Sequence, residues 1–126
     1  MEYQATAKYI RVSTRKVRLL ADSIRGMKAL EAVGILRATP QHAAKPMVDA
    51  IMSAVANATQ KQAAADSLKI AAIDVMGGPA LKRWHAASKG MAHPFKKRMS
   101  HIKVILTDGV TKVNTEEKKE VIKGGK

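Results

Sequence analysis

A basic segment without acidic residues lies between two strand-like segments and most restricts the folds open to this chain. Residues 75–107 contain seven lysines and arginines and no aspartate or glutamate. Alternating and β-branched apolar residues predict strands over 68–76 and 100–107. The residues between them, 77–99, are too many for a simple connection and too poor in apolar periodicity to form a core. We therefore expect both strands to extend into a projecting hairpin that bends near Gly90.

The charge of the chain indicates what such a hairpin could lie against. An isolated two-stranded ribbon is only marginally stable in water, so it needs a partner. The 126 residues carry a net charge of +13, of which +5 falls in residues 1–30 and +7 in residues 75–107, while residues 31–74 are neutral. Two concentrated basic segments predict two surfaces that bind the phosphates of a polyanion. An aromatic content of 3% argues against a protein that binds mainly by base stacking.

The remaining composition excludes several classes of protein. A hydrophobic content of 46% excludes a wholly disordered basic tail, and the absence of cysteine excludes disulfides, thiolate zinc sites and cysteine nucleophiles. No nucleophile, base and orienting acid cluster in the sequence, and Gly77-Gly78-Pro79 precedes no helix that could hold a phosphate. We expect neither catalysis nor a cofactor. The first ten residues lack a secretory pattern and no apolar run nears the roughly 20 residues of a membrane span, so we expect a cytoplasmic protein.

Periodicity and capping residues predict the elements that precede the hairpin. They are a strand at 3–9, a helix from Ser13 to about Arg25, a short helix at 28–38 and a long helix at 39–62. Thr39 and Pro40 should open the long helix, and Pro46 should kink it. A change of phase near Ala71 and Ala72 predicts a bulge in the strand at 68–76. We expect one domain over 1–108, followed by a disordered tail at 109–126.

The same periodicity predicts which side chains form the core. Apolar residues three or four apart on the helices, and two apart on the last strand, should face one another. They are Val17, Leu20, Ala21 and Ile24; Leu30, Val33 and Leu36; Met47, Ile51, Val55 and Ala58; and Ile102, Val104 and Leu106.

The predicted first helix carries the second basic cluster. Arg15, Lys16, Arg18 and Arg25 could form an ordinary solvated face, with Arg18 paired to Asp22 one turn on. Cations in the first turn, however, lie at the positive end of the helix dipole, which disfavours them in the isolated protein. A polyanion that docks there would remove this penalty.

The residues of the predicted hairpin allow two interpretations other than phosphate binding. It could be a mobile surface loop with solvated lysines. His85, His93 and His101 are evenly spaced, but no carboxylate lies between Asp74 and Asp108 and the surrounding charge repels a divalent cation, so we expect no metal.

A DNA-architectural protein is a further alternative, because basic β-arms also enter minor grooves with an apolar wedge, here Pro94 and Phe95. The basic first helix favours RNA, since it requires a second phosphate surface. Trp84 could stack on a base or anchor the hairpin on the body, and stacking is the preferred interpretation.

Four stretches of this sequence together resemble one known family. They are Ser13-Thr14-Arg15-Lys16-Val17-Arg18-Leu19 continuing to Asp22-Ser23-Ile24-Arg25-Gly26, then Ser53-Ala54-Val55-Ala56-Asn57-Ala58, Gly78-Pro79-Ala80-Leu81-Lys82-Arg83 and Lys97-Arg98-Met99-Ser100-His101-Ile102. In order and spacing the chain resembles the large-subunit ribosomal protein twenty-two family over about residues 3–108.

This resemblance implies a fold, a function and a set of site residues. The fold is α+β, a three-stranded antiparallel sheet packed on three helices with a long protruding β-hairpin at about 77–101. The implied partners are large-subunit ribosomal RNA, neighbouring ribosomal proteins and the nascent polypeptide in the exit tunnel, with a part in subunit assembly. The implied RNA-binding residues are Arg11, Arg15, Lys16, Arg18, Arg25, Lys82, Arg83, Trp84, Lys89, Lys96, Lys97, Arg98, Ser100 and His101. The implied tunnel-lining tip comprises Ala87, Ser88, Lys89, Gly90, Met91 and Ala92.

Overall fold

The computed structural model describes residues 1–108, and the predicted disordered tail lies outside these described residues. The elements in chain order are β1 (Glu2–Ile10), α1 (Thr14–Ile24), α2 (Ala29–Ala38), α3 (Ala44–Gln60), the 3-10 turn η1 (Ala65–Ser67), β2 (Leu68–Ala86), the 3-10 turn η2 (Ser88–Gly90) and β3 (Ala92–Asp108). The three strands form one antiparallel sheet in the order β1-β3-β2. Among the described residues, no helix combines the length and apolar character needed to cross a bilayer.

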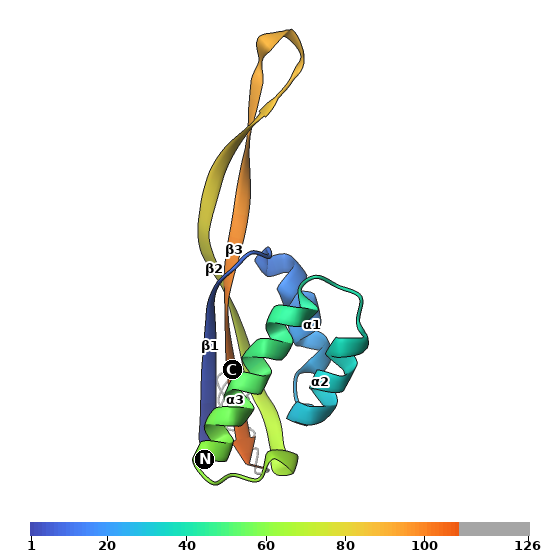
Figure 1. The fold of residues 1–126 in the computed structure, drawn as a ribbon, viewed down its shortest axis with the longest axis vertical. Helices are drawn as coiled ribbons and strands as arrows, with labels where there is room; N and C mark the ends of the chain where they lie inside the picture. The colour runs from blue at the N-terminus through green and yellow to red at the C-terminus, as the bar shows by residue number, and fades with distance from the viewer. Residues whose placement is uncertain (109–126) are drawn as a thin grey trace, which may run out of the picture.

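The helices cover one face of the sheet, and the core lies between the two layers (Figure 1). Ile102, Val104 and Leu106 of the central strand β3 are fully buried, as their alternation predicts. The helix α3 packs on β1 and β3, and α1 packs on β2. The small residues Ala50 and Ala54 let α3 approach the sheet closely, and the Asn57 side-chain amide donates to the Gln4 carbonyl at 3.0 Å. The predicted α+β architecture is confirmed.

The predicted apolar faces of the helices are confirmed with one exception. All the residues named for α1 and α3 are buried, as are Val33 and Leu36 of α2, but Leu30 is exposed.

The predicted start of α3 is wrong. The helix begins at Ala44. Thr39 is instead the C-cap of α2, and its hydroxyl donates to the Ile35 carbonyl at 2.9 Å. A proline directly after a helix end is as typical as one at a helix start, so Thr39-Pro40 fits both arrangements. Pro46 then falls in the first turn of α3, where backbone N–H groups have no acceptor within the helix, and it interrupts no hydrogen bond.

Bulges change the direction of side chains in both outer strands. The register of β2 shifts between Ile70 and Ala72, which confirms the predicted bulge and turns Ile73 into the core. A second shift, between Ala7 and Ile10 of β1, places Tyr9 at a φ of 58° and leaves its side chain exposed. The alternation predicted for residues 3–9 therefore ends before Tyr9.

The predicted hairpin is present and extends far beyond the body (Figure 1). We call residues 80–98 the arm, in which β2 and β3 pair from Ala80 opposite Arg98 to Ala86 opposite Ala92. Every residue of the arm is exposed except Ala87, which is half-buried. The bend at η2 has Lys89 at a φ of 59° and Gly90 at 67°, so the predicted position of the bend is confirmed. The arm contributes nothing to the core.

Candidate nucleic-acid interface

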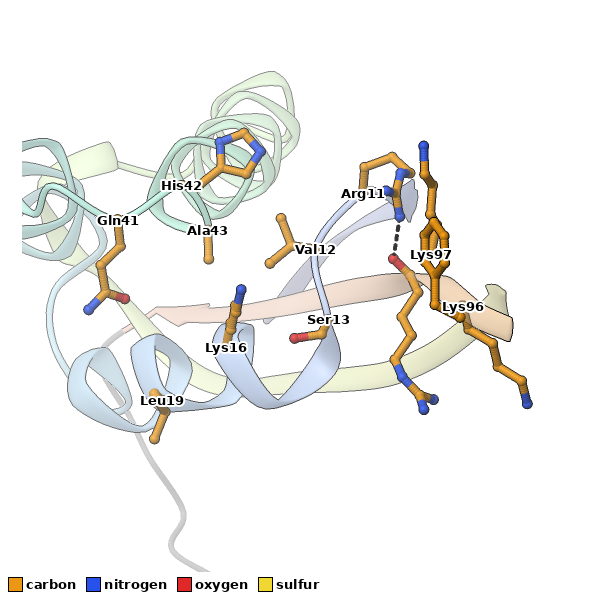
Figure 2. Close-up of a pocket in the computed structure, with 12 residues that line it drawn as sticks. Arg11, Val12, Ser13, Lys16, Leu19, Gln41, His42, Ala43, Lys96 and Lys97 are labelled. Carbon is orange, nitrogen blue, oxygen red and sulfur yellow. Dashed lines mark hydrogen bonds between the residues drawn. The ribbon is translucent and has the colours of Figure 1, made fainter. Parts of the chain in front are cut away.

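The base of the arm runs past the start of α1, and a cleft opens between them. We call this the arm–body cleft; its volume is about 640 Å³. Figure 2 shows its lining side chains, which come from the arm, from the start of α1 and the residues just before it, and from the loop before α3. They are Arg11, Val12, Ser13, Lys16, Leu19, Gln41, His42, Ala43, Phe95, Lys96, Lys97 and Arg98. The cleft unites cations from both basic segments of the sequence, and no acidic residue lines it.

A hydrogen bond joins the two walls of this cleft. The Arg11 guanidinium donates from Nη1 to the backbone carbonyl of Arg98 at 2.7 Å (Figure 2). This contact spans body and arm at the point where the arm leaves the sheet. Because a guanidinium has five N–H donors, Arg11 keeps donors for an external anion.

Arg18 and Arg25 lie on a different side of α1, against the outer edge of β2. Their guanidinium groups donate to the carbonyls of Val75 at 3.3 Å and Ile73 at 3.4 Å. Arg25 also pairs with Asp22 at 3.4 Å, so the pairing of Asp22 with Arg18 that the sequence suggested is wrong. Both arginines remain exposed and form a second cationic group away from the cleft.

Arg15 lies in the first turn of α1 and is exposed. Within residues 1–108 it makes no hydrogen bond or ion pair through its side chain. That turn contains no acidic residue either. The positive end of the α1 dipole and its cations therefore face solvent together.

The arm places like charges directly opposite one another. Lys82 pairs with Lys96 in the strand register, and side chains in directly opposite positions share a face. Both ion pairs in the described part of the chain lie elsewhere, between Arg25 and Asp22 and between Lys28 and Glu31. Such a pairing is destabilising in the free protein and becomes favourable when a polyanion lies along the arm.

Two aromatic rings of the arm are exposed, and one of them, Phe95, lines the arm–body cleft. Trp84 is 70% exposed and lies opposite Pro94 in the register, and Phe95 is 43% exposed. Trp84 lines a shallow hollow formed by arm residues alone, and its exposed ring is available for stacking.

The three histidines do not form a cluster. His85 lies opposite His93 in the register, and His101 lies opposite Met76 in the body of the sheet. The bend at η2 sets this register, so His101 does not lie opposite His85. Within residues 1–108, no three potential ligand side chains come together to hold a metal ion.

Ser100 and His101, which the resemblance adds to the RNA-binding set, have structural contacts here. Ser100 is fully buried, and its hydroxyl has no hydrogen-bond partner. The His101 Nδ1 accepts a hydrogen bond from the Tyr9 backbone N–H at 3.0 Å, and the two rings meet edge to face at 5.0 Å. The structure places Ser100 apart from the exposed cationic surface.

Sequence reasoning missed most of the apolar floor of the arm–body cleft. Val12, Leu19 and Ala43 come from separate segments, and no periodicity relates them. Leu19 carried the one available signal, because it lies off the apolar face of α1 and is 67% exposed. A large apolar side chain that is exposed on an otherwise polar helix face points to a contact outside the core.

Comparison with known proteins agrees with this arrangement. The family model for ribosomal protein L22p/L17e matches residues 5–107. The large ribosomal subunit protein uL22 of Syntrophotalea carbinolica is 46% identical over 109 residues, which cover 86% of this chain and 99% of that protein. The uL22 proteins of Leptospira biflexa and Opitutus terrae are 40% and 39% identical, and the matches cover 90% and 86% of this chain and 100% and 97% of theirs. This chain therefore belongs to the ribosomal protein L22p/L17e family.

Proposed function

We propose that the chain binds large-subunit ribosomal RNA through two surfaces, the start of α1 with the arm–body cleft, and the arm. The observation that carries this proposal is the uncompensated positive charge of the arm. The arm contains no acidic residue, and its Lys82 lies opposite Lys96. At its base, Arg98 lines the arm–body cleft together with Lys16 of α1. Phosphates on both sides would satisfy these charges. The Arg18 and Arg25 group would add contacts along the β2 edge.

Membership of the ribosomal protein L22p/L17e family supports this proposal. Its members are structural and non-catalytic, and the relatives are named as proteins of the large ribosomal subunit. The chain is thus a ribosomal constituent that works in the cytoplasm, with ribosomal RNA and ribosomal proteins around it. This membership favours ribosomal RNA over the DNA-architectural alternative.

The tip of the arm has a separate role in the proposal. Residues 87–92 are small or apolar apart from Lys89, and all but Ala87 are exposed. We place this tip in the wall of the nascent-peptide exit tunnel, where it would meet the growing polypeptide. The extension of the arm beyond the body supports this placement (Figure 1).

The proposed mechanism is scaffolding in two steps. The body docks first through α1 and the arm–body cleft, because this surface is rigidly held by the core. The arm, which has no core of its own, then orders along the RNA during assembly. Binding releases counterions from the phosphates, so affinity should fall steeply with salt.

Filter binding to large-subunit ribosomal RNA at several salt concentrations tests the proposal. Log affinity should fall linearly with log salt, and Arg15→Ala should reduce the slope by about 0.9, the effect of one lost phosphate contact. Arg37→Ala is a matched control, since Arg37 is an exposed cation in the last turn of α2. An affinity that does not depend on salt would contradict the proposal.

Incorporation into subunits separates the two surfaces. Replacing Arg15 and Arg18 by alanine should weaken incorporation, whereas deleting residues 87–92 should leave it largely intact. If the deletion abolishes incorporation and the double substitution does not, the arm is the primary anchor and the proposed order is wrong. Co-sedimentation of the protein with nucleoid instead of large subunits in moderate salt would favour the DNA alternative.

A further inference from the structure

We propose that the arm–body cleft holds the base of a single unpaired RNA nucleotide, with the adjoining phosphates on its cationic rim. This inference rests on the proposed RNA-binding function and names what one part of that surface recognises. The cleft volume of about 640 Å³ falls within the roughly 300–1,000 Å³ typical of small-ligand sites. A row of phosphate contacts on a surface requires no cavity of this size.

The floor of the cleft is suited to the flat face of a base. Of its apolar lining residues, Val12 and Ala43 are buried and the Phe95 ring is exposed, whereas the Leu19 side chain points away from Val12 and Ala43 and borders the cleft from the side (Figure 2). A base that leaves its helical stack exposes an apolar π face, and in protein complexes such bases stack on aromatic and apolar side chains. A base inside a duplex offers no free face, so a duplex would leave this floor unused.

The rim of the cleft is suited to the backbone on either side of that base. Arg11 and Lys16 stand on the body side, and Lys96, Lys97 and Arg98 stand on the arm side (Figure 2). Polar groups lie between them: the Ser13 hydroxyl makes no capping hydrogen bond with α1. Phosphates are held by cations of this kind, and base edges are read by hydroxyl, amide and imidazole groups such as those of Ser13, Gln41 and His42.

The two walls are fixed before any RNA arrives. The hydrogen bond from Arg11 to the Arg98 carbonyl at 2.7 Å joins the arm to the body beside the cleft. Val12 and Ala43 belong to the hydrophobic core. The site therefore requires little reorganisation on binding, in contrast to the rest of the arm.

Two RNA hairpins with the same stem test this inference, one fully paired and one with a single-uridine bulge that carries 4-thiouridine. Fluorescence anisotropy at one salt concentration gives the affinity of the full chain for each. The bulged hairpin should bind about tenfold more tightly, the order of effect that one base–aromatic stack provides. Phe95→Ala should abolish this preference while the affinity for the paired hairpin changes by less than about twofold. Leu81→Ala, which shortens an exposed apolar side chain of the arm outside the cleft, should retain the preference.

Irradiation of the bulged complex with the unaltered chain gives an independent readout. Mass spectrometry should place the thiouridine cross-link within residues 11–19, 41–43 or 95–98. Equal affinity of the unaltered chain for the two hairpins, or a cross-link confined to residues 82–94, would overturn the cleft site and leave the proposed function standing. Failure to bind either hairpin in a salt-dependent way would instead overturn the proposed function.

Discussion

Hydrogen bonds from a few individual residues, through backbone and side-chain groups, cover the exposed edge of the sheet. β2 is an outer strand, and the Ile70 backbone N–H and carbonyl pair with Met27 and Gly26 at 2.9 and 3.1 Å. Farther along the same edge, Arg25 and Arg18 donate to the carbonyls of Ile73 and Val75. Unpaired strand edges invite association with other chains, so these contacts protect the edge of β2 while the guanidinium groups retain further donors.

The contact between Tyr3 and Asp108 gives the free protein a measurable pH dependence. The Tyr3 hydroxyl donates to Asp108 Oδ2 at 2.8 Å; this hydrogen bond, together with burial and the nearby carboxylate charge, raises the pKa of Tyr3 above 10.0. The neutral phenol is therefore favoured in the folded state. Its contribution to stability is complete below pH about 10 and is lost as the pH rises through the raised pKa.

Tyr3→Phe should accordingly reduce the loss of stability at alkaline pH. Urea unfolding of both proteins at about pH 9 and about pH 11 measures the difference, because the two proteins differ only in the Tyr3 hydroxyl. A decline in stability of equal size in both proteins would show that Tyr3 makes no such contribution.

Two adjacent glycines at the base of the arm provide a matched pair. A Cβ on Gly78 would lie 3.3 Å from the Met99 backbone carbon, from Met99 Cβ and from His101 Cε1, whereas one on Gly77 would meet nothing within 4 Å. Gly78→Ala should lower the free energy of unfolding by about 1 kcal/mol, because the backbone of β3 at Met99 must move. Gly77→Ala should change it by less than about 0.5 kcal/mol. Chemical denaturation checks both, and equal effects would contradict the close approach at Gly78.

At the scale of elements, the arm is a ribbon that only its backbone pairing holds together. Its bend is closed by the hydrogen bond from the Ala87 N–H to the Met91 carbonyl at 2.9 Å. Lys89 adopts a positive φ, a conformation that non-glycine residues rarely take. The bend should therefore open more readily than any helix of the body.

Limited trypsin digestion should show this difference. Within residues 1–108 the free protein should be cut first after Lys89, and the same bond should be protected in assembled large subunits, because the arm orders on RNA. Exposed Arg37 on α2 serves as the internal comparison in the free protein. Equal protection of the Lys89 bond in both states would contradict ordering on binding.

Considered as a whole, the molecule has a body whose stability does not depend on the length of the arm. Every buried residue in the described range lies at or before Ile73 or at or after Ser100. The body thus has a complete core between the helices and the lower part of the sheet, and the arm adds exposed surface and charge to it.

Replacing the arm by a two-residue Asn-Gly turn should leave a folded body. Such a turn suits an antiparallel pair, and the substitution removes the opposition of Lys82 and Lys96. The melting temperature, followed by circular dichroism, should stay within about 5 °C of that of the full chain. Loss of a cooperative transition would show that the arm supports the core.

The local structure and the distribution of charge follow from the amino-acid sequence alone. Periodicity predicted the apolar faces of α1 and α3, the bulge near Ala71 and the extended hairpin with its bend at Gly90, because these depend on backbone preferences over a few residues. It also predicted that both basic segments face a polyanion, since no acid lies near the arm in the sequence.

How these parts meet depends on the tertiary fold. Arg11 and Lys16 join Lys96–Arg98 around a cleft, while Arg18, only two residues beyond Lys16, turns to the edge of β2. Thr39 ends α2 although its pattern equally suits the start of α3. Each outcome depends on which unpaired carbonyl or apolar surface another segment brings within reach, and that is fixed by strand order and helix packing, which local sequence does not encode.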